Sequence, residues 1–190
     1  PCAMANLQHF GIIGGGAWGT ALGIALARAG RNVTLWAREA EVVAAINTQH
    51  ENKLFLPGVT LDPALQATGE LKDLLSCDAL VLVTPVQHTR KVCEQLAVLH
   101  PAKNTPIIIC AKGIEQNTLA LPGAIVTEAL PEHPLAILSG PTFAIEVARN
   151  QPTALTLACL DAALGVALTR AISSPAFRPY LSEDVIGAQI

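Results

Sequence analysis

The sequence predicts an α/β protein with a doubly wound, mostly parallel sheet. Short apolar runs alternate with longer amphipathic stretches along the 190 residues, as strands alternate with helices in such folds. Two runs, residues 79–84 and 106–110, are almost wholly apolar, which is typical of strands buried on both faces. Hydrophobic residues make up 51% of the chain and aromatic residues only 4%, so the expected core is aliphatic.

The expected elements follow one another through short connections. We expect strands at residues 10–13, 32–36, 79–84, 106–110, 135–138, 153–159 and 177–181. We expect helices at residues 20–29, 39–49, 71–76, 86–99, 123–130, 142–149 and 160–173. Between residues 51 and 69, the breakers Pro57, Gly58 and Pro63 predict an irregular segment. Seven or eight strands interleaved with helices therefore form the expected sheet.

A glycine-rich turn between the first strand and the first helix is the most informative local signal. Gly14, Gly16 and Gly19 form a G-x-G-x-x-G pattern in the order strand, turn, helix, which a dinucleotide-binding site requires. The first glycine permits the tight turn, the second lets backbone approach a pyrophosphate, and the third lets the helix pack closely. The N–H groups that begin the helix would then bind the phosphates. The alternative is a glycine-rich turn without a ligand.

Composition excludes several other classes of function. Net charge is −3 and no basic tract is present, so nucleic-acid binding has little support. No apolar stretch reaches the roughly 20 residues of a membrane span, and no signal peptide or metal-binding motif is evident. The five cysteines, Cys2, Cys77, Cys93, Cys110 and Cys159, form no C-x-x-C pair, which favours a reducing cytoplasm and argues against zinc.

The carboxyl ends of the expected strands provide the remaining candidate residues, because ligands gather there in such sheets. After the second strand, where NAD enzymes usually carry an acid for the ribose, this chain has Ala37 and Arg38. A guanidinium there can pair with a 2′-phosphate, which favours NADP over NAD. The later strand ends are followed by Pro85, by Lys112, and by the Ser-Gly-Pro-Thr segment that begins at Ser139.

Four segments on successive strand ends carry a resemblance to a known family. The chain resembles the bacterial-type NAD(P)-dependent glycerol-3-phosphate dehydrogenases from about residue 10 to residue 190. The matching segments are residues 14–21 (GGGAWGTA), 35–38 (LWAR), 110–115 (CAKGIE) and 138–144 (LSGPTFA). The resemblance implies a Rossmann-type domain and reversible hydride transfer between NAD(P)H and dihydroxyacetone phosphate. The product, sn-glycerol 3-phosphate, would serve phospholipid synthesis.

The resemblance also implies roles for individual residues. Lys112 is expected to contact cofactor and substrate and to take part in catalysis. The other expected cofactor contacts are Gly14, Gly16, Ala17, Trp18, Gly19, Arg38, Pro85 and Ala144. Gly140 and Thr142 are expected to line the substrate site, and the helix that begins at Thr142 to offer free N–H groups to an anion. Ala17 departs from the serine that the family often has, so only a backbone contact is expected there.

The family's second domain is all-helical and supplies the lysine that protonates the ketone. The resemblance therefore implies that residues 1–181 form the NAD(P)-binding domain and that residues 182–190 begin the connection to a helical domain absent from this chain. Residues 177–190 are then expected to be exposed, and the longer protein could be a homodimer. The 190-residue chain by itself is expected to bind the dinucleotide without reducing dihydroxyacetone phosphate.

Two other readings stay open. One is a different NAD(P)-dependent dehydrogenase of similar architecture, such as a ketopantoate reductase or a sugar-acid dehydrogenase, which turnover of dihydroxyacetone phosphate would distinguish. The other is a non-catalytic NAD(P)-binding module.

Overall fold

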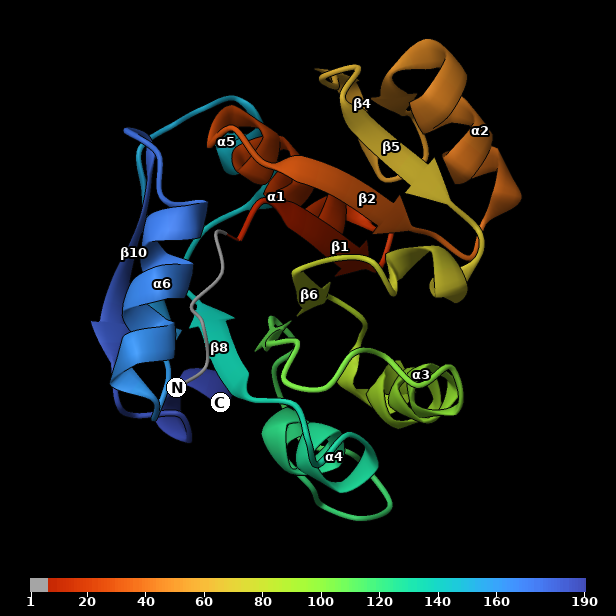
Figure 1. Ribbon diagram of the computed structural model, residues 1–190. Coiled ribbons are helices and arrows are strands. Elements are labelled where there is room, and N and C mark those ends of the chain that lie inside the picture. Colours follow the sequence, from red (N-terminus) through yellow and green to blue (C-terminus); the bar gives the residue numbers. More distant parts are fainter. Residues whose placement is uncertain (1–6) are drawn as a thin grey trace.

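The computed structural model describes residues 7–190, so Cys2 lies outside the described residues (Figure 1). Eight described strands form one sheet in the order β10-β9-β8-β7-β6-β1-β2-β5, and two more form a separate hairpin. The sheet consists of β1 (His9–Ile13), β2 (Asn32–Trp36), β5 (Leu65–Thr68), β6 (Ala79–Leu82), β7 (Ile107–Ile109), β8 (Leu135–Ser139), β9 (Thr153–Ala158) and β10 (Phe177–Ser182). The hairpin pairs β3 (Glu51–Asn52) with β4 (Leu56–Thr60).

Strand directions confirm the expected doubly wound, mostly parallel sheet. Pairings from β5 through β2, β1, β6 and β7 to β8 are all parallel. β9 is antiparallel to β8, and β10 is parallel to β9. The order of the six parallel strands is that of a dinucleotide-binding fold, in which the strand order reverses between β1 and β6 while the strands stay parallel. The turns that follow β1 and β6 therefore lie beside each other at one edge.

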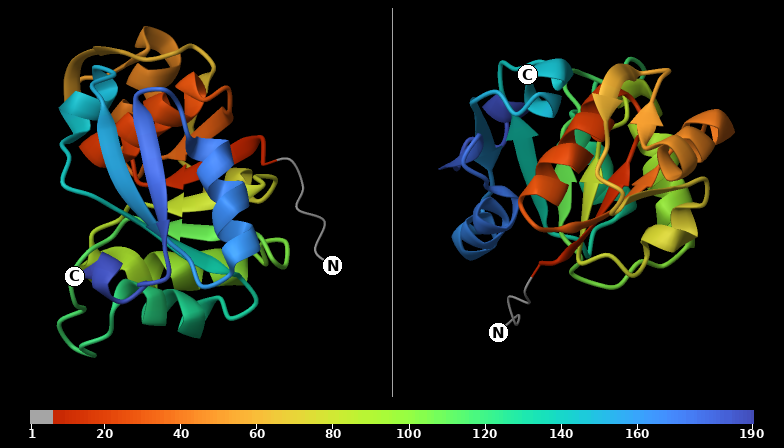
Figure 2. Two further views of the ribbon diagram at one scale, coloured as in Figure 1. Left: turned by 90° about the vertical axis from the view of Figure 1, so that its left-hand side faces the viewer. Right: turned by 90° about the horizontal axis from the view of Figure 1, so that it is seen from above.

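Helices cover both faces of the sheet (Figures 1 and 2). Helix α1 (Ala17–Arg28) packs against α5 (Ala144–Ala148) on one face, and α3 (Val86–Val98) packs against α4 (Pro122–Ala129) on the other. Helix α2 (Ala40–Gln49) contacts β5, and α6 (Ala162–Ile172) lies along β10. Two short 3₁₀ turns, η1 (Leu71–Leu74) and η2 (Gly187–Gln189), complete the elements.

The two faces of the sheet build two separate aliphatic cores. Along β1, Phe10 and Ile12 belong to the core under α1, whereas Ile13 belongs to the core under α3 and α4. In β6, Val81 belongs to the core under α1 and Leu82 to the core under α3 and α4. Because successive side chains of a strand point to opposite faces, a continuously apolar strand serves both cores at once.

Several expectations about the elements are wrong. Residues 51–69 are not irregular, because they contain the β3–β4 hairpin and β5, the edge strand of the main sheet. Helix α1 begins at Ala17 and not at residue 20, with Gly16 as its N-cap. Residues 177–190 are not uniformly exposed: Phe177 and Gln189 are each only 4% exposed, whereas Leu181 and Ile190 are exposed.

Proline and glycine residues explain why the strands between residues 51 and 69 are not evident in the sequence. Pro57 and Gly58 lie inside β4, which is paired only with the two-residue strand β3, so the sheet tolerates them. The four-residue β5 has only Leu65 and Ala67 as buried apolar positions, too short a pattern to stand out.

No helix in residues 7–190 is long and apolar enough to cross a bilayer. Within the same residues, no group of three histidine, cysteine or acidic side chains could hold a metal ion.

Candidate functional site

The glycine turn after β1 has the geometry that its sequence predicts. Gly14 has a φ of +134°, which side chains rarely adopt, and its N–H donates to the carbonyl of Trp36 in β2. A Cβ atom at Gly19 would lie 1.9 Å from the carbonyl oxygen of Gly14, so no other residue fits there without moving the turn. A Cβ atom at Gly16 would meet nothing within 4 Å, which means that the turn is open on that side.

The N-terminus of α1 is available to an anion. Gly16, its N-cap, provides no side-chain hydrogen bond, and the first turn contains no acidic residue. The first N–H groups of a helix have no partner within the helix, and the helix dipole makes this end positive. Next to the open side of Gly16, these groups are candidate donors for a phosphate or pyrophosphate.

The end of β2 carries a cation on the surface. The Arg38 side chain is 78% exposed and lies 3.1 Å from the Glu39 carboxylate. Ala37 occupies the position where many NAD enzymes have an acid, and it is fully buried. A Cβ atom added to Gly15 would lie 2.5 Å from the Cβ atom of Ala37. Position 37 is therefore closely packed against the glycine turn, whereas the exposed Arg38 can exchange Glu39 for another anion.

The start of α1 also meets the end of β7. Burial raises the pKa of the Cys110 thiol to about 12, and a hydrogen bond with the Trp18 side chain opposes this shift. The thiol is therefore protonated and unreactive at neutral pH. Its contact with Trp18 brings the Lys112 segment, two residues further on, next to the glycine turn.

The Lys112 segment is rigidly held although its lysine is exposed. Gly113, with a φ of +99°, donates its N–H to the carbonyl of Gln189 at 3.0 Å. Glu115 is buried and receives bonds from the Arg90 guanidinium at 3.0 to 3.1 Å. These hydrogen bonds, together with one from Thr118, hold the pKa of the Glu115 carboxyl below its usual range. Lys112 has no acidic partner within residues 7–190.

The segment after β8 is less suited to an anion than the sequence indicates. Thr142 precedes the helix, because α5 begins only at Ala144 and has five residues. The Glu146 carboxylate accepts the N–H of Phe143 at 3.2 Å, so an acid of the chain itself stands at this helix start. The helix therefore begins two residues later than expected, and the N–H of Phe143 in front of it already has a partner.

The candidate residues share one edge of the sheet, because the turns after β1, β2, β6, β7 and β8 all follow parallel strands. Pro85 is exposed and is the N-cap of α3, next to the buried hydroxyl pair of Thr84 and Thr89. Gly140 packs against Leu155 of β9. The residues that stand at this edge are Gly14, Gly16, Ala17, Trp18, Gly19, Arg38, Pro85, Lys112, Gly140, Thr142 and Ala144.

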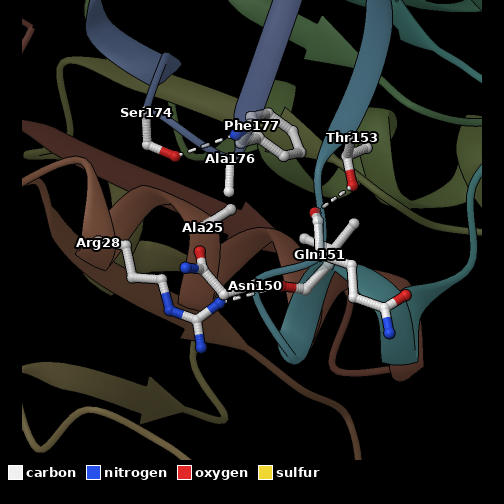
Figure 3. Close-up of a pocket in the computed structure, with 9 residues that line it drawn as sticks. Ala25, Arg28, Asn150, Gln151, Thr153, Ser174, Ala176 and Phe177 are labelled. Carbon is white, nitrogen blue, oxygen red and sulfur yellow. Dashed lines mark hydrogen bonds between the residues drawn. The ribbon is translucent and has the colours of Figure 1, made fainter.

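A small cavity lies at the C-terminal end of α1, far from the glycine turn at the other end of the helix (Figure 3). Its volume is about 10 Å³, enough for a single water molecule. Arg28 lies beside it and donates to the carbonyls of Val147 and Ala148 at 3.0 and 2.7 Å. The guanidinium therefore caps the end of α5 and fixes α1 against it.

Sequence reasoning missed two residues that hold the site together. Asn52 is fully buried in the hairpin and donates to the carbonyl of Gly15 at 2.9 Å. Gln189 accepts the N–H of Gly123 through its side chain and binds Gly113 through its backbone. Neither residue stands in a recognisable motif, and both meet their partners only through the fold.

Comparisons with known proteins agree with this geometry. The sequence model of the family described as the NAD-dependent glycerol-3-phosphate dehydrogenase N-terminus matches residues 9–165. A glycerol-3-phosphate dehydrogenase (NAD(P)+) from Paramagnetospirillum magneticum is 54% identical over 97% of this chain and 66% of its own length. The corresponding protein from Caulobacter vibrioides is 53% identical over 97% of this chain and 55% of its own length.

A solved structure is similar over the same part of the chain. The crystal structure of glycerol-3-phosphate dehydrogenase from Coxiella burnetii superposes with a TM-score of 0.89 at 32% identity, covering 96% of this chain and 56% of that one. This chain thus spans between half and two thirds of the length of these relatives. Its sequence and fold both place it in the family of NAD-dependent glycerol-3-phosphate dehydrogenases, to whose N-terminal part it corresponds.

Proposed function

We propose that the chain is the dinucleotide-binding part of an enzyme that transfers hydride between NAD(P)H and dihydroxyacetone phosphate. The open N-terminus of α1 beside the glycine turn carries the proposal, since it offers N–H donors and a positive dipole to a pyrophosphate. Membership of the family supports the choice of reaction and substrate. The product, sn-glycerol 3-phosphate, is a precursor suited to phospholipid synthesis.

In this proposal, each strand end contributes to one part of the site. The turn at Gly14, Gly16 and Gly19 holds the pyrophosphate with the backbone of Ala17 and Trp18. Arg38 pairs with the adenosine 2′-phosphate when NADP is bound, and Pro85 lies along the cofactor. These assignments are supported by the shared edge of the parallel strands, where ligands of such sheets bind.

Lys112 is the proposed contact with the reacting end of the substrate. Its ammonium is exposed and has no acidic partner in the described residues, so it can bind a carbonyl oxygen without losing an existing ion pair. A positive charge fixed there stabilises the negative charge that develops on the oxygen as hydride arrives at carbon. Gly140 and Thr142 line the substrate side, and Ala144 lies on the nicotinamide side.

The cellular setting is part of the proposal. The cysteines within residues 7–190 are free thiols, and Cys77, Cys93 and Cys159 are buried. Free thiols agree with a reducing cytoplasm. We also propose that the longer protein forms a homodimer, which a measurement of its mass in solution would test.

Nucleotide binding by the 190-residue chain is the first test of this proposal. NADPH fluorescence is titrated with the unsubstituted chain and with Gly19→Ala, whose added Cβ atom displaces the turn. We expect saturable binding by the unsubstituted chain and a large loss in the variant. Equal responses of the two would contradict binding at the glycine turn.

A further inference from the structure

Asn52 is the hairpin side chain that is hydrogen-bonded to the glycine turn within residues 7–190. It is fully buried, and its amide nitrogen donates both to the carbonyl of Gly15 at 2.9 Å and to the hydroxyl of Thr20 at 2.8 Å. Its amide oxygen accepts the N–H of Phe55 at 3.2 Å. Both hydrogens of the amide are thus used on α1 and its turn, and only the oxygen serves the hairpin.

Thr20 extends this contact to the next peptide group. Its hydroxyl is buried and donates to the carbonyl of Gly16 at 2.9 Å while it accepts from Asn52. Asn52 therefore fixes two successive carbonyls of the turn, that of Gly15 directly and that of Gly16 through Thr20. A buried chain of this kind is expensive to break, because each lost bond leaves a polar group without a partner.

Fixing the orientation of these two carbonyl groups also fixes the orientation of two N–H donors, those of Gly16 and Ala17. In a planar trans peptide group, the N–H points opposite to the carbonyl. With the Gly15 carbonyl turned toward Asn52, the N–H of Gly16 points away from it, and the Gly16 carbonyl orients the N–H of Ala17 in the same way. The turn is open around Gly16, where an added Cβ atom would meet nothing within 4 Å.

We propose that Asn52 is a positioning residue that aims the N–H groups of Gly16 and Ala17 at the pyrophosphate of the bound dinucleotide. The inference rests on the proposed function, since it assumes that the dinucleotide binds at this turn. It predicts an effect on every ligand that contains the pyrophosphate, whichever group the ribose carries.

The test compares Asn52→Ala and Thr20→Val with the unsubstituted chain, using NADPH, NADH and adenosine 2′-monophosphate as probes. We expect both variants to lose about tenfold in affinity for both dinucleotides, the effect of one misplaced donor. Affinity for adenosine 2′-monophosphate, which has no pyrophosphate, should change by less than about twofold.

Asn47→Ala is the matched control. The Asn47 amide also makes two bonds to backbone, donating to the carbonyl of Ala67 and accepting its N–H, both at 2.8 Å, but it does not touch the turn. We expect this variant to bind both dinucleotides as tightly as the unsubstituted chain, with circular dichroism confirming the fold of each protein.

Dinucleotide affinities unchanged in folded variants would overturn the inference, and so would an equal loss for adenosine 2′-monophosphate, which would mean a general structural role. If Asn52→Ala does not fold, Thr20→Val decides, because valine keeps the shape of the buried side chain. Failure of the unsubstituted chain to bind either dinucleotide would instead refute the proposed function on which the inference rests.

Discussion

Replacing Arg38 with alanine tests the choice between NADP and NAD. The guanidinium now lies 3.1 Å from the Glu39 carboxylate, but its side chain is 78% exposed, so breaking this pair costs only about 0.2–1 kcal/mol. A charge-assisted bond to a 2′-phosphate contributes about 1.5–3 kcal/mol. The difference leaves roughly 0.5–2.8 kcal/mol in favour of NADPH, which corresponds to about 2- to 100-fold in affinity.

Titration of NADPH and NADH into the unsubstituted chain and Arg38→Ala measures this difference. The variant should lose most of the preference, with NADH affinity nearly unchanged, because NADH has no 2′-phosphate. Glu39→Gln is the complementary variant: it frees Arg38 from its partner and should strengthen NADPH binding slightly. Equal weakening of both nucleotides in Arg38→Ala would refute the assignment, since it would mean a contact with a group that both nucleotides share.

Three further predictions concern the proposed role of Lys112, the glycine turn and the ion pair of Arg90 with Glu115. In a chain of the relatives' full length, Lys112→Ala should lower kcat/KM by at least about 100-fold, because one positioned charge contributes about 3 kcal/mol to stabilising the transition state. The Tm of this variant should not fall. Near-normal turnover would exclude the proposed role of Lys112. Gly19→Ala should lower both Tm and nucleotide affinity, because the Cβ atom of the alanine would lie 1.9 Å from the carbonyl oxygen of Gly14. Calorimetry measures the Tm, and an unchanged value would contradict this prediction. The Arg90 guanidinium lowers the pKa of the Glu115 carboxyl, so this pair stabilises the fold above the ordinary glutamate pKa and the stabilisation is lost as pH falls through the lowered value. Urea unfolding from about pH 6 down to about pH 2.5, a range that extends below the ordinary glutamate pKa, should therefore show a smaller acid loss for Arg90→Leu than for the unsubstituted chain, and parallel curves would count against the pair.

Local patterns were enough to predict most of the elements. The continuously apolar run at residues 79–84 contains β6, which is buried at every position, and residues 32–36, where buried and more exposed positions alternate, form β2. Gly14 and Gly19 were predicted with their reasons, since a positive φ and a close helix approach each exclude a side chain locally. The nucleotide roles of the strand-end residues remain predictions.

Other features could not be found in this way. Helix α5 begins later than the pattern predicts because Phe143 is still extended and the carboxylate of Glu146 accepts its N–H. The strands β3, β4 and β5 are too short, and β4 too rich in breakers, for their pairing to be visible before the partner strand is known. Only β5 pairs with β2, and it packs against α2, whereas β3 and β4 form a separate hairpin.

The amino-acid sequence by itself determined where the chain alternates between strand and helix and where the glycines must stand, because these depend on periodicity and on contacts between near neighbours. Only the tertiary structure decided that Asn52 braces a turn 37 residues away and that Gln189 holds the Lys112 segment. Such contacts depend on the order of the strands in the sheet. The strand order follows from burying apolar side chains in two cores at once, and it brings distant segments together. A local sequence pattern contains no information about this order.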